Sequence, residues 1–224
     1  MILIGVISTT YVLSSESDKT AVNRVRNSVD SSNANQRAAR GKQSDKIPNY
    51  LVYSQDNKSF RFYDDLVRDR IVIINLMYTT CEGICPITTS NLIKVYDLLG
   101  DRVGKDVLFL SISIDQDDTP AKLKKYANYY GERKGWYYLT GNYDEIENLR
   151  RQLGLYDLDP VIDADKTQHG GLITFGNDRT NRWAALPAMM NAREIVRALS
   201  RITREKNWRY DKFQNKSKTE RSKI

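Results

Sequence analysis

The sequence predicts an α/β fold built on one central mixed β-sheet flanked by helices. Two nearly continuous apolar and β-branched runs, 70–78 (RIVIINLMY) and 106–114 (DVLFLSISI), are typical of strands buried on both faces. Between and after them lie stretches whose apolar residues recur with helical spacing. The alternation of strands and helices favours a single sheet covered by helices on both sides.

The first half of the pattern supplies the outer strands and the first helix. The runs 50–54 (YLVYS) and 60–65 (FRFYDD) predict a pair of short strands ahead of the buried strand 70–78. Pro86 in a first helical turn, followed by apolar residues at helical spacing, predicts a helix that ends at Gly100.

The second half continues the alternation. Thr119 with Pro120 after it, and Asn142, are typical N-caps of two further helices. The remaining predicted elements are the strands 136–140 (WYYLT), 170–177 (GGLITFGN) and 181–187 (NRWAALP) and the helix 191–203 (NAREIVRALSRIT).

Composition divides the chain into four segments. Residues 1–15 lack charged side chains, which predicts a short signal or anchor segment, with a buried N-terminal strand as the alternative. Residues 16–49 are polar and without apolar periodicity, so we expect a flexible tether. The folded domain is expected over 50–203, and a basic tail over 204–224.

The net charge of +7 is concentrated at the ends of the chain. Residues 14–50 carry 7 Lys and Arg against 4 Asp and Glu, residues 204–224 carry 8 against 3, and the stretch between carries 20 against 21. Basic tails on a near-neutral body suit an anionic lipid surface or simple solvation better than nucleic acid, which we do not expect as a partner.

Cys81 and Cys85 are the only cysteines, four positions apart in a loop and helix start after the buried strand. A helix N-terminus stabilises a thiolate. Two side chains at this spacing can form a disulfide or hold one soft metal ion. The alternatives are two inert buried thiols or a structural disulfide, but a bridge across so short a loop contributes little entropy.

His169 is the only histidine and precedes a predicted strand. That strand would lie beside the strand leading to the cysteines, so His169 is a candidate third ligand. Two thiolates and one imidazole suit copper, whereas structural zinc normally has four such ligands and a blue-copper site needs two histidines. Asp115, at the end of the strand 106–114, is a candidate accessory residue, although acidic residues before a helix are more often caps.

Five segments taken in order resemble the SCO/SenC family over about residues 50–203. They are YTTCEGICPITTSNL, SISIDQDDTP, KGWYYLTG, LRRQLGLYDLDP and QHGGLITFGN. The resemblance implies a thioredoxin-like fold and a copper chaperone for cytochrome c oxidase assembly, with copper held by Cys81, Cys85 and His169. Many members have Asp directly before the histidine, where this chain has Gln168.

The same resemblance implies partners and a location. The expected partners are the copper-binding subunit of cytochrome c oxidase, other copper chaperones and a membrane bound through the N-terminal segment. The expected location is the bacterial inner membrane with the domain facing the periplasm, or the mitochondrial inner membrane facing the intermembrane space.

A second function remains open at this point: a membrane-anchored thiol-disulfide oxidoreductase in which Cys81 and Cys85 form the redox pair. Thioredoxin-class enzymes place two residues between their cysteines and a proline before the facing strand. Here three residues intervene, and no proline lies between Pro160 and Pro187. We therefore expect a metallochaperone rather than a turnover enzyme.

Overall fold

The computed structural model describes residues 42–165 and 171–203. The predicted N-terminal segment 1–15, the tail 204–224 and most of the predicted tether lie outside the described residues. The strands are β1 (Leu51–Ser54), β2 (Ser59–Arg61), β3 (Ile71–Met77), β4 (Val107–Ser113), β5 (Trp136–Gly141), β6 (Leu172–Asn177) and β7 (Arg182–Pro187). The α-helices are α2 (Ile84–Leu99), α3 (Pro120–Tyr129), α4 (Tyr143–Gln152), α5 (Pro160–Ala164) and α6 (Ala192–Thr203).

These strands form one mixed sheet in the order β2-β1-β5-β4-β3-β6-β7. The central strands β3, β4 and β5 are parallel, and β6 pairs with β3 in antiparallel register, with Ile73 opposite Phe175. The predicted central mixed sheet is confirmed. The predicted neighbour of the cysteine-bearing connection is confirmed as well, because β6 lies directly beside β3.

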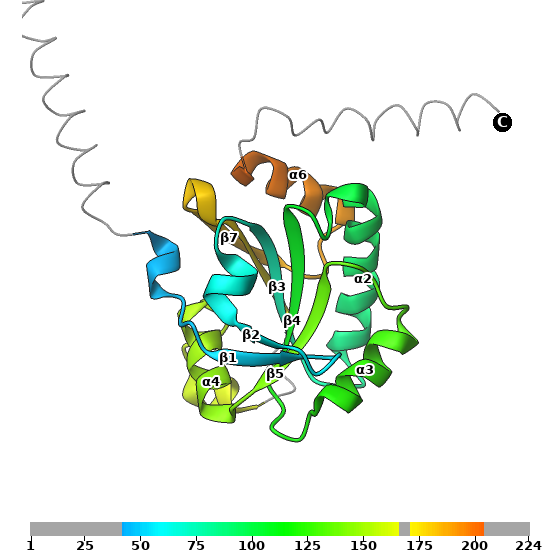
Figure 1. Cartoon of the computed structure of the whole chain (residues 1–224), viewed down its shortest axis with the longest axis vertical. Coiled ribbons are helices and arrows are strands. Elements are labelled where there is room, and N and C mark those ends of the chain that lie inside the picture. The colour runs from blue at the N-terminus through cyan, green and yellow to red at the C-terminus, as the bar shows by residue number, and fades with distance from the viewer. Residues whose placement is uncertain (1–41, 166–170, 204–224) are drawn as a thin grey trace, which may run out of the picture. The chain divides into compact units, whose positions relative to one another are not determined.

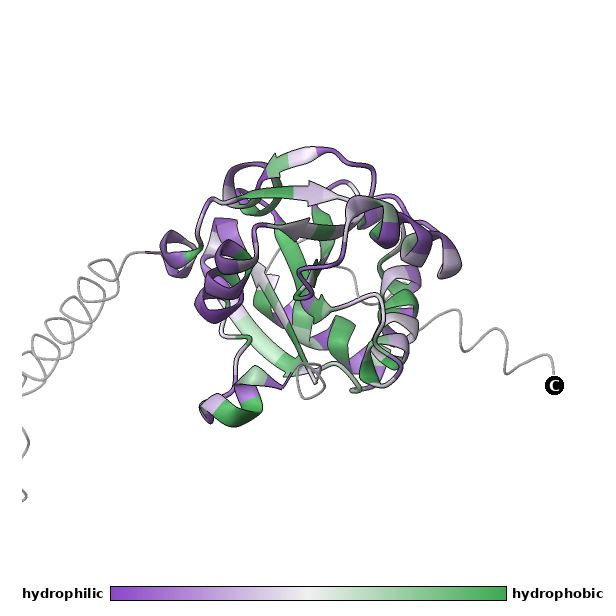
Figure 2. Ribbon diagram, turned by 90° about the horizontal axis from the view of Figure 1, so that it is seen from below, coloured by the Kyte–Doolittle hydropathy of each residue, from purple (hydrophilic) through white to green (hydrophobic). Residues whose placement is uncertain are grey.

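Helices cover both faces of this sheet (Figure 1). One face packs against α2, α3 and α6 through residues such as Leu92, Leu123 and Leu199, all fully buried. The other face packs against α4 and the one-turn π-helix η2 (Phe62–Val67). Every residue of β3 and β4 is buried, which explains their continuous apolar sequences, and Figure 2 shows the hydrophobic central strands between helices of mixed hydropathy.

The predicted caps set the starts of the helices beside the central strands. The Thr119 side chain accepts from the N–H of Lys122, and the Asn142 side chain accepts from the N–H of Glu145. The helix α2 ends before Gly100, which has a φ of +55°. These three predictions are confirmed.

The prediction of a second outer strand over residues 60–65 is wrong after Arg61. The strand β2 stops there, and Phe62–Val67 forms η2. Phe62, Leu66 and Val67 are at most 1% exposed, so the helical turn places all three in the core. A strand would have sent neighbouring side chains to opposite faces of the sheet.

The folded part begins before the expected boundary at Tyr50. Residues Gln43–Lys46 form a 3-10 helix (η1), and the Gln43 N–H donates to the Asn181 side chain at 2.6 Å. Ser44 and Ile47 are 1% and 7% exposed, and Ile47 belongs to the core beneath η2 and α4. The last residues of the predicted tether are therefore part of the domain, because burying Ile47 offsets the cost of ordering them.

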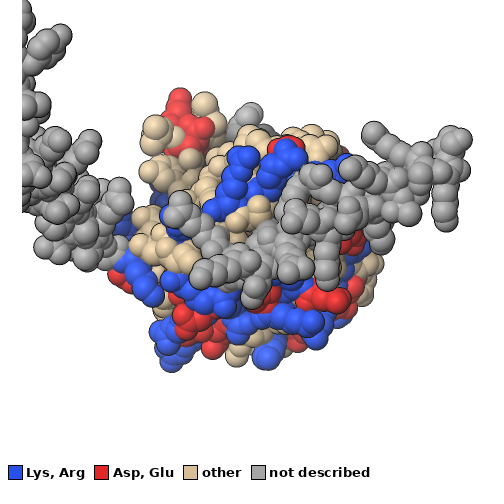
Figure 3. Space-filling model, turned by 90° about the horizontal axis from the view of Figure 1, so that it is seen from above, with Lys and Arg blue, Asp and Glu red and all other residues tan. Residues whose placement is uncertain are grey.

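Among residues 42–165 and 171–203, none of the helices combines the length and the apolar content of a membrane-spanning helix. On the face seen in Figure 3, Lys and Arg side chains lie interspersed with Asp and Glu. This mixture agrees with the near-neutral charge of the segment between the tails.

Gly135 precedes β5 with a φ of +77°, and a Cβ there would lie 2.3 Å from the backbone nitrogen of Gly104. We expect Gly135→Ala to destabilise the domain by about 3 kcal/mol, since backbone strain adds to a clash with backbone that must move. Urea unfolding of the variant measures this loss.

Gly154→Ala is the matched control. Gly154 has a φ of +72° but nothing within 4 Å of the added Cβ, so the expected cost is only the strain of about 1 kcal/mol. Equal losses in the two variants would contradict the role given to the Gly104–Gly135 contact.

Candidate functional site

The two cysteines lie at the edge of the sheet where β3 and β4 both end. Because these strands are parallel, the segments that follow Met77 and Ser113 leave the sheet at the same edge. Cys81 lies in the loop after β3, and Cys85 lies in the first turn of α2. Both are free thiols, 8% and 3% exposed.

A hydrogen bond connects the two cysteines. The N–H of Cys85 donates to the Cys81 sulfur at 3.4 Å, and the Cys81 N–H donates to the carbonyl of Tyr78 at 3.2 Å. The Cys81 sulfur therefore lies at the start of α2, facing backbone N–H groups that helix geometry leaves unpaired. The predicted convergence of the two cysteines is present in the structure.

The surroundings of Cys81 favour its thiolate. Burial opposes ionisation, but hydrogen bonds from the Cys85 thiol, from the N–H groups of Cys85 and Gly83 and from the Tyr78 hydroxyl outweigh it. The pKa of Cys81 is therefore lower than its ordinary value.

The pKa values of two groups that donate to the Cys81 sulfur shift in the opposite direction. Burial, together with donation to Cys81, raises the pKa of Cys85 to about 12, and the same two causes raise the pKa of Tyr78 to about 12. At neutral pH the site thus contains one activated sulfur, Cys81, and one protonated thiol, Cys85. This asymmetry suits nucleophilic attack by Cys81.

The loop that carries Cys81 is held by Asp118, whose side chain is buried. One carboxylate oxygen of Asp118 accepts from the Thr79 N–H at 2.9 Å and from the Ser113 hydroxyl at 2.6 Å, and the other accepts from the Thr79 hydroxyl. Its backbone carbonyl accepts from Thr140 in β5 at 2.9 Å. Asp118 is therefore a positioning residue that the sequence analysis did not select.

Asp115 is the accessory residue predicted from the sequence. The Asp115 carboxylate accepts from the N–H of Asp117 at 3.1 Å, and its own N–H donates to Ser113. An accessory role for Asp115 at a metal site stays a prediction. Sequence spacing gave no signal that Asp118, rather than its acidic neighbours, turns into the interior.

His169 lies outside the described residues. The strand that follows it, β6, lies beside β3 and so runs from the edge of the sheet that carries the cysteine loop. In the part of the chain that the structure describes, no group of three or more His, Cys, Asp or Glu side chains is placed to hold a metal ion. Cys81 and Cys85 are the two predicted ligands that the structure describes, and the three-ligand metal site stays a prediction.

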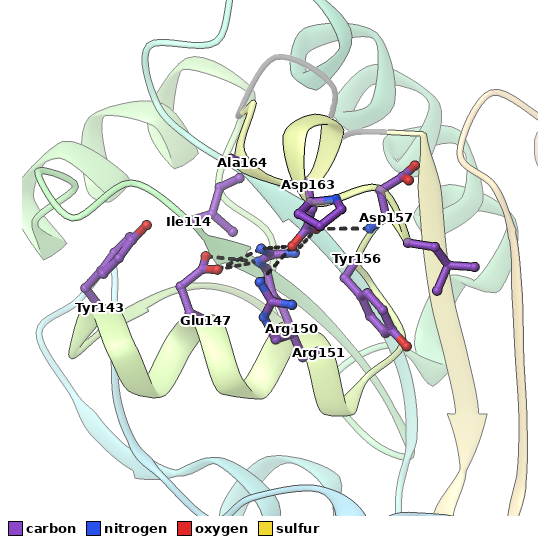
Figure 4. Close-up of a pocket in the computed structure, with 11 residues that line it drawn as sticks. Ile114, Tyr143, Glu147, Arg150, Arg151, Tyr156, Asp157, Asp163 and Ala164 are labelled. Carbon is purple, nitrogen blue, oxygen red and sulfur yellow. Dashed lines mark hydrogen bonds and ion pairs between the residues drawn. The ribbon is translucent and has the colours of Figure 1, made fainter.

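A buried ion pair holds the short helix α5, which precedes the His169 segment. Figure 4 shows Asp163 of α5 pointing toward Arg150 and Arg151 of α4, beside a pocket of about 340 Å³. Arg150 donates to Asp163 at 2.6 and 2.8 Å, and both side chains are 3% exposed. Arg150 also pairs with Glu147 at 2.7 Å. These hydrogen bonds hold the pKa of the Asp163 carboxyl well below its usual range.

Comparison with known proteins assigns the family. A family model described as SCO1/SenC matches residues 39–204. The chain belongs to the SCO1/SenC family. Its relatives include a candidate copper-binding protein of Stutzerimonas stutzeri, 30% identical over 123 residues, which are 54% of this chain and 56% of that protein. This SCO1/SenC chain spans about half the length of the curated relatives it matches.

Two solved structures of Sco proteins share the fold. ScoI of Bradyrhizobium japonicum, determined with copper bound, is 24% identical with a TM-score of 0.55, covering 70% of this chain and 99% of that one. BsSco, described with a disulfide switch and as a member of the Sco family of cytochrome c oxidase assembly proteins, is 23% identical with a TM-score of 0.57, covering 71% and 94%. The predicted thioredoxin-like fold is confirmed.

Removal of the Tyr78 hydroxyl tests the asymmetry of the SCO1/SenC thiol pair. Tyr78→Phe deletes a donor to the Cys81 sulfur, so we expect the pKa of Cys81 to rise and its alkylation at neutral pH to slow. Mass spectrometry of iodoacetamide labelling against pH measures this shift. Tyr96→Phe, which removes a hydroxyl bonded to the carbonyl of Lys134, is the control and should leave the profile unchanged.

The Arg150–Asp163 pair predicts a pH-dependent stability. The folded-state pKa of Asp163 is depressed. Its contribution to the free energy of unfolding is therefore complete above the unfolded-state pKa of about 3.9, and it is lost as pH falls through the lower folded-state pKa. We expect Asp163→Asn to cost about 3 kcal/mol at neutral pH, a difference that shrinks in strong acid. Urea unfolding of both proteins across this range measures it.

Arg151→Gln is the matched control, since Arg151 pairs with the same carboxylate but is 54% exposed. It should cost less than about 1 kcal/mol. A larger loss than that of Asp163→Asn would contradict the assignment of the stability to the buried pair.

Proposed function

We propose that this chain binds one copper ion through Cys81, Cys85 and His169 and delivers it to the copper-binding subunit of cytochrome c oxidase. The observation that carries the proposal is the convergence of two otherwise unused thiols at one helix start. Two sulfurs and one imidazole form a soft donor set suited to copper. The relatives described as copper-binding or solved with copper support the same assignment.

Cys81, Cys85 and Asp118 would have different roles in binding and releasing the copper ion. The lowered pKa of Cys81 makes its thiol the easier of the two to ionise, whereas Cys85, whose pKa is raised to about 12, must lose a tightly held proton to become a ligand. Asp118 fixes the loop that presents Cys81. Delivery would proceed by replacement of these sulfurs by the partner's ligands, and Cys81, although 8% exposed, lines an open groove from which a partner could approach.

The place of action and further partners belong to the same proposal. The uncharged segment 1–15 supports attachment to the bacterial inner membrane with the domain on the periplasmic side. The description of BsSco as one of the oxidase assembly proteins supports a role in that process. Other copper chaperones would supply the ion.

A second candidate, thiol-disulfide exchange, is favoured by the asymmetry of the two pKa values. The Cys81 thiolate would attack a disulfide of the partner, form a mixed disulfide and release one partner thiolate. Cys85 would then lose its proton and attack the Cys81 sulfur. This second step forms the Cys81–Cys85 disulfide, releases the second partner thiolate and completes a two-electron reduction of the partner. The disulfide switch described for BsSco agrees with such chemistry.

One experiment separates the two candidates. We expect the reduced, purified chain to bind one copper per chain. Cys81→Ala, Cys85→Ala and His169→Ala should each lower its copper affinity by more than the roughly 10–100-fold that loss of an outer-shell partner costs. Affinity is measured against a competing chelator, beside the rate of disulfide exchange.

His169→Ala gives the decisive comparison, because it leaves both thiols in place. Lost copper affinity with intact exchange supports the chaperone. Unchanged affinity with slowed exchange would instead support the oxidoreductase, and a Cys81→Ala/Cys85→Ala double variant with full copper content would overturn the copper proposal.

A further inference from the structure

Cys81 is one of the residues that line an open groove beside α3. The groove has a volume of about 420 Å³, and its walls come from the loop after β3, from Pro86 in α2 and from α3. Figure 1 shows α3 beside the end of α2 at which the helix begins, and the Thr89–Tyr126 hydrogen bond of 2.9 Å joins the two helices there. Cys81 therefore lines a groove large enough to receive part of another molecule.

The α3 wall of the groove is aromatic. Tyr126, Tyr129 and Tyr130 line it, with ring centroids 4.8 Å apart for Tyr126 and Tyr130 and 5.0 Å apart for Tyr129 and Tyr130. Tyr126 is buried, whereas Tyr129 is 83% exposed. An aromatic surface that is rigid at its base and open at its rim is typical of protein recognition sites.

The same wall is positively charged. Lys122 and Lys125 line the groove at helical spacing from Tyr129, and both are exposed. Neither ammonium group has a hydrogen bond or ion pair with any described residue, and no carboxylate is among the residues that line the groove. Lys124 differs, because it pairs with Asp56 at 2.6 Å and with Glu132 at 2.7 Å.

We propose that this groove binds an extended polypeptide segment of the partner that carries an acidic side chain close to the cysteine which meets Cys81. The carboxylate would pair with Lys122 and Lys125, and the backbone and apolar groups would lie against Tyr129 and Tyr130. The inference rests on the proposed function, since it names the chemistry of the partner at the same site. A concave groove whose lining includes a buried cysteine fits a chain segment better than a flat lipid surface.

The test uses the full chain with Cys85→Ser and a short synthetic peptide whose only cysteine is a mixed disulfide with thionitrobenzoate. The Cys81 thiolate attacks the peptide sulfur, a protein–peptide disulfide forms, and thionitrobenzoate leaves with the electron pair of the broken bond. Its colour gives the rate. One peptide has glutamates beside the cysteine and the other has lysines.

We expect the glutamate peptide to react about tenfold faster than the lysine peptide at low ionic strength. The preference should fade in about 1 M salt, where screening acts over only about 3 Å. Lys122→Glu/Lys125→Glu should invert the preference, Lys122→Gln/Lys125→Gln should abolish it, and Tyr129→Ala should slow both peptides.

Two controls isolate the groove. Rates with the neutral disulfide dithiodipyridine correct for any change in the intrinsic reactivity of Cys81. Lys105→Glu introduces the same charge change at the opposite end of β4, where Lys105 is also exposed, and should leave the preference unaltered.

Equal rates for the two peptides, or an effect of Lys105→Glu as large as that of Lys122→Glu, would overturn the inference. So would binding to phosphatidylglycerol vesicles that depends on Lys122 and Lys125 without any peptide preference. Copper content, measured separately with Cys85 intact, should be the same in Lys122→Glu/Lys125→Glu as in the unmodified chain. A chain that keeps the peptide preference but binds no copper would refute the proposed function and leave the groove assignment standing.

Discussion

The buried carboxylate of Asp118 is the contact on which the geometry of the thiol site depends. Parallel pairing brings the ends of β3 and β4 together, but it does not fix how the chain after β3 continues. Asp118 fixes this path by accepting from Thr79 in the β3 loop and from Ser113 at the end of β4. A buried carboxylate costs free energy unless its oxygens are hydrogen-bonded, so the three donors are required together.

The electronic difference between the thiols follows from this placement. Once the loop is fixed, the Cys81 sulfur lies where the start of α2 presents its N–H groups, and Cys85, in the first turn of α2, is more deeply buried. Two chemically identical side chains thus acquire different pKa values from position alone. Cys81, whose ionised form is favoured, also lines the groove along α3, so access and reactivity coincide at this residue.

Sequence patterns predicted the elements whose signals are local. Runs such as 70–78 are almost entirely apolar because both faces of the sheet are covered, and Thr119 and Asn142 act as caps through their own neighbours. The segment 60–65 was misassigned because FRFYDD alternates like a strand, although tertiary packing turns Phe62 into the core.

Features that depend on long-range contacts could not be predicted in this way. Ile47, the single apolar residue of the run 42–47 (KQSDKI), gave no sign that η1 would pack on the domain. The cysteine pair was found from its spacing, whereas Asp118 was not, since only the tertiary structure shows which of the acidic residues 115, 117 and 118 meets Thr79. Likewise, only the tertiary structure shows that Lys124 forms ion pairs with Asp56 and Glu132, whereas Lys122 and Lys125 line the groove.

Disulfide exchange and copper binding, the two proposed functions, require different protonation states of Cys81 and Cys85. Attack on a disulfide begins from the Cys81 thiolate, and Cys85 gives up its proton only in the second step. Copper binding under the proposed function needs both sulfurs at once, so the Cys85 proton must be displaced as the ion is bound. Because the pKa of Cys85 is raised to about 12, that proton opposes copper binding throughout the physiological pH range. Under the proposed function, the burial that keeps the Cys85 thiol protonated would also lower its affinity for the ion and so favour transfer of the ion to a partner.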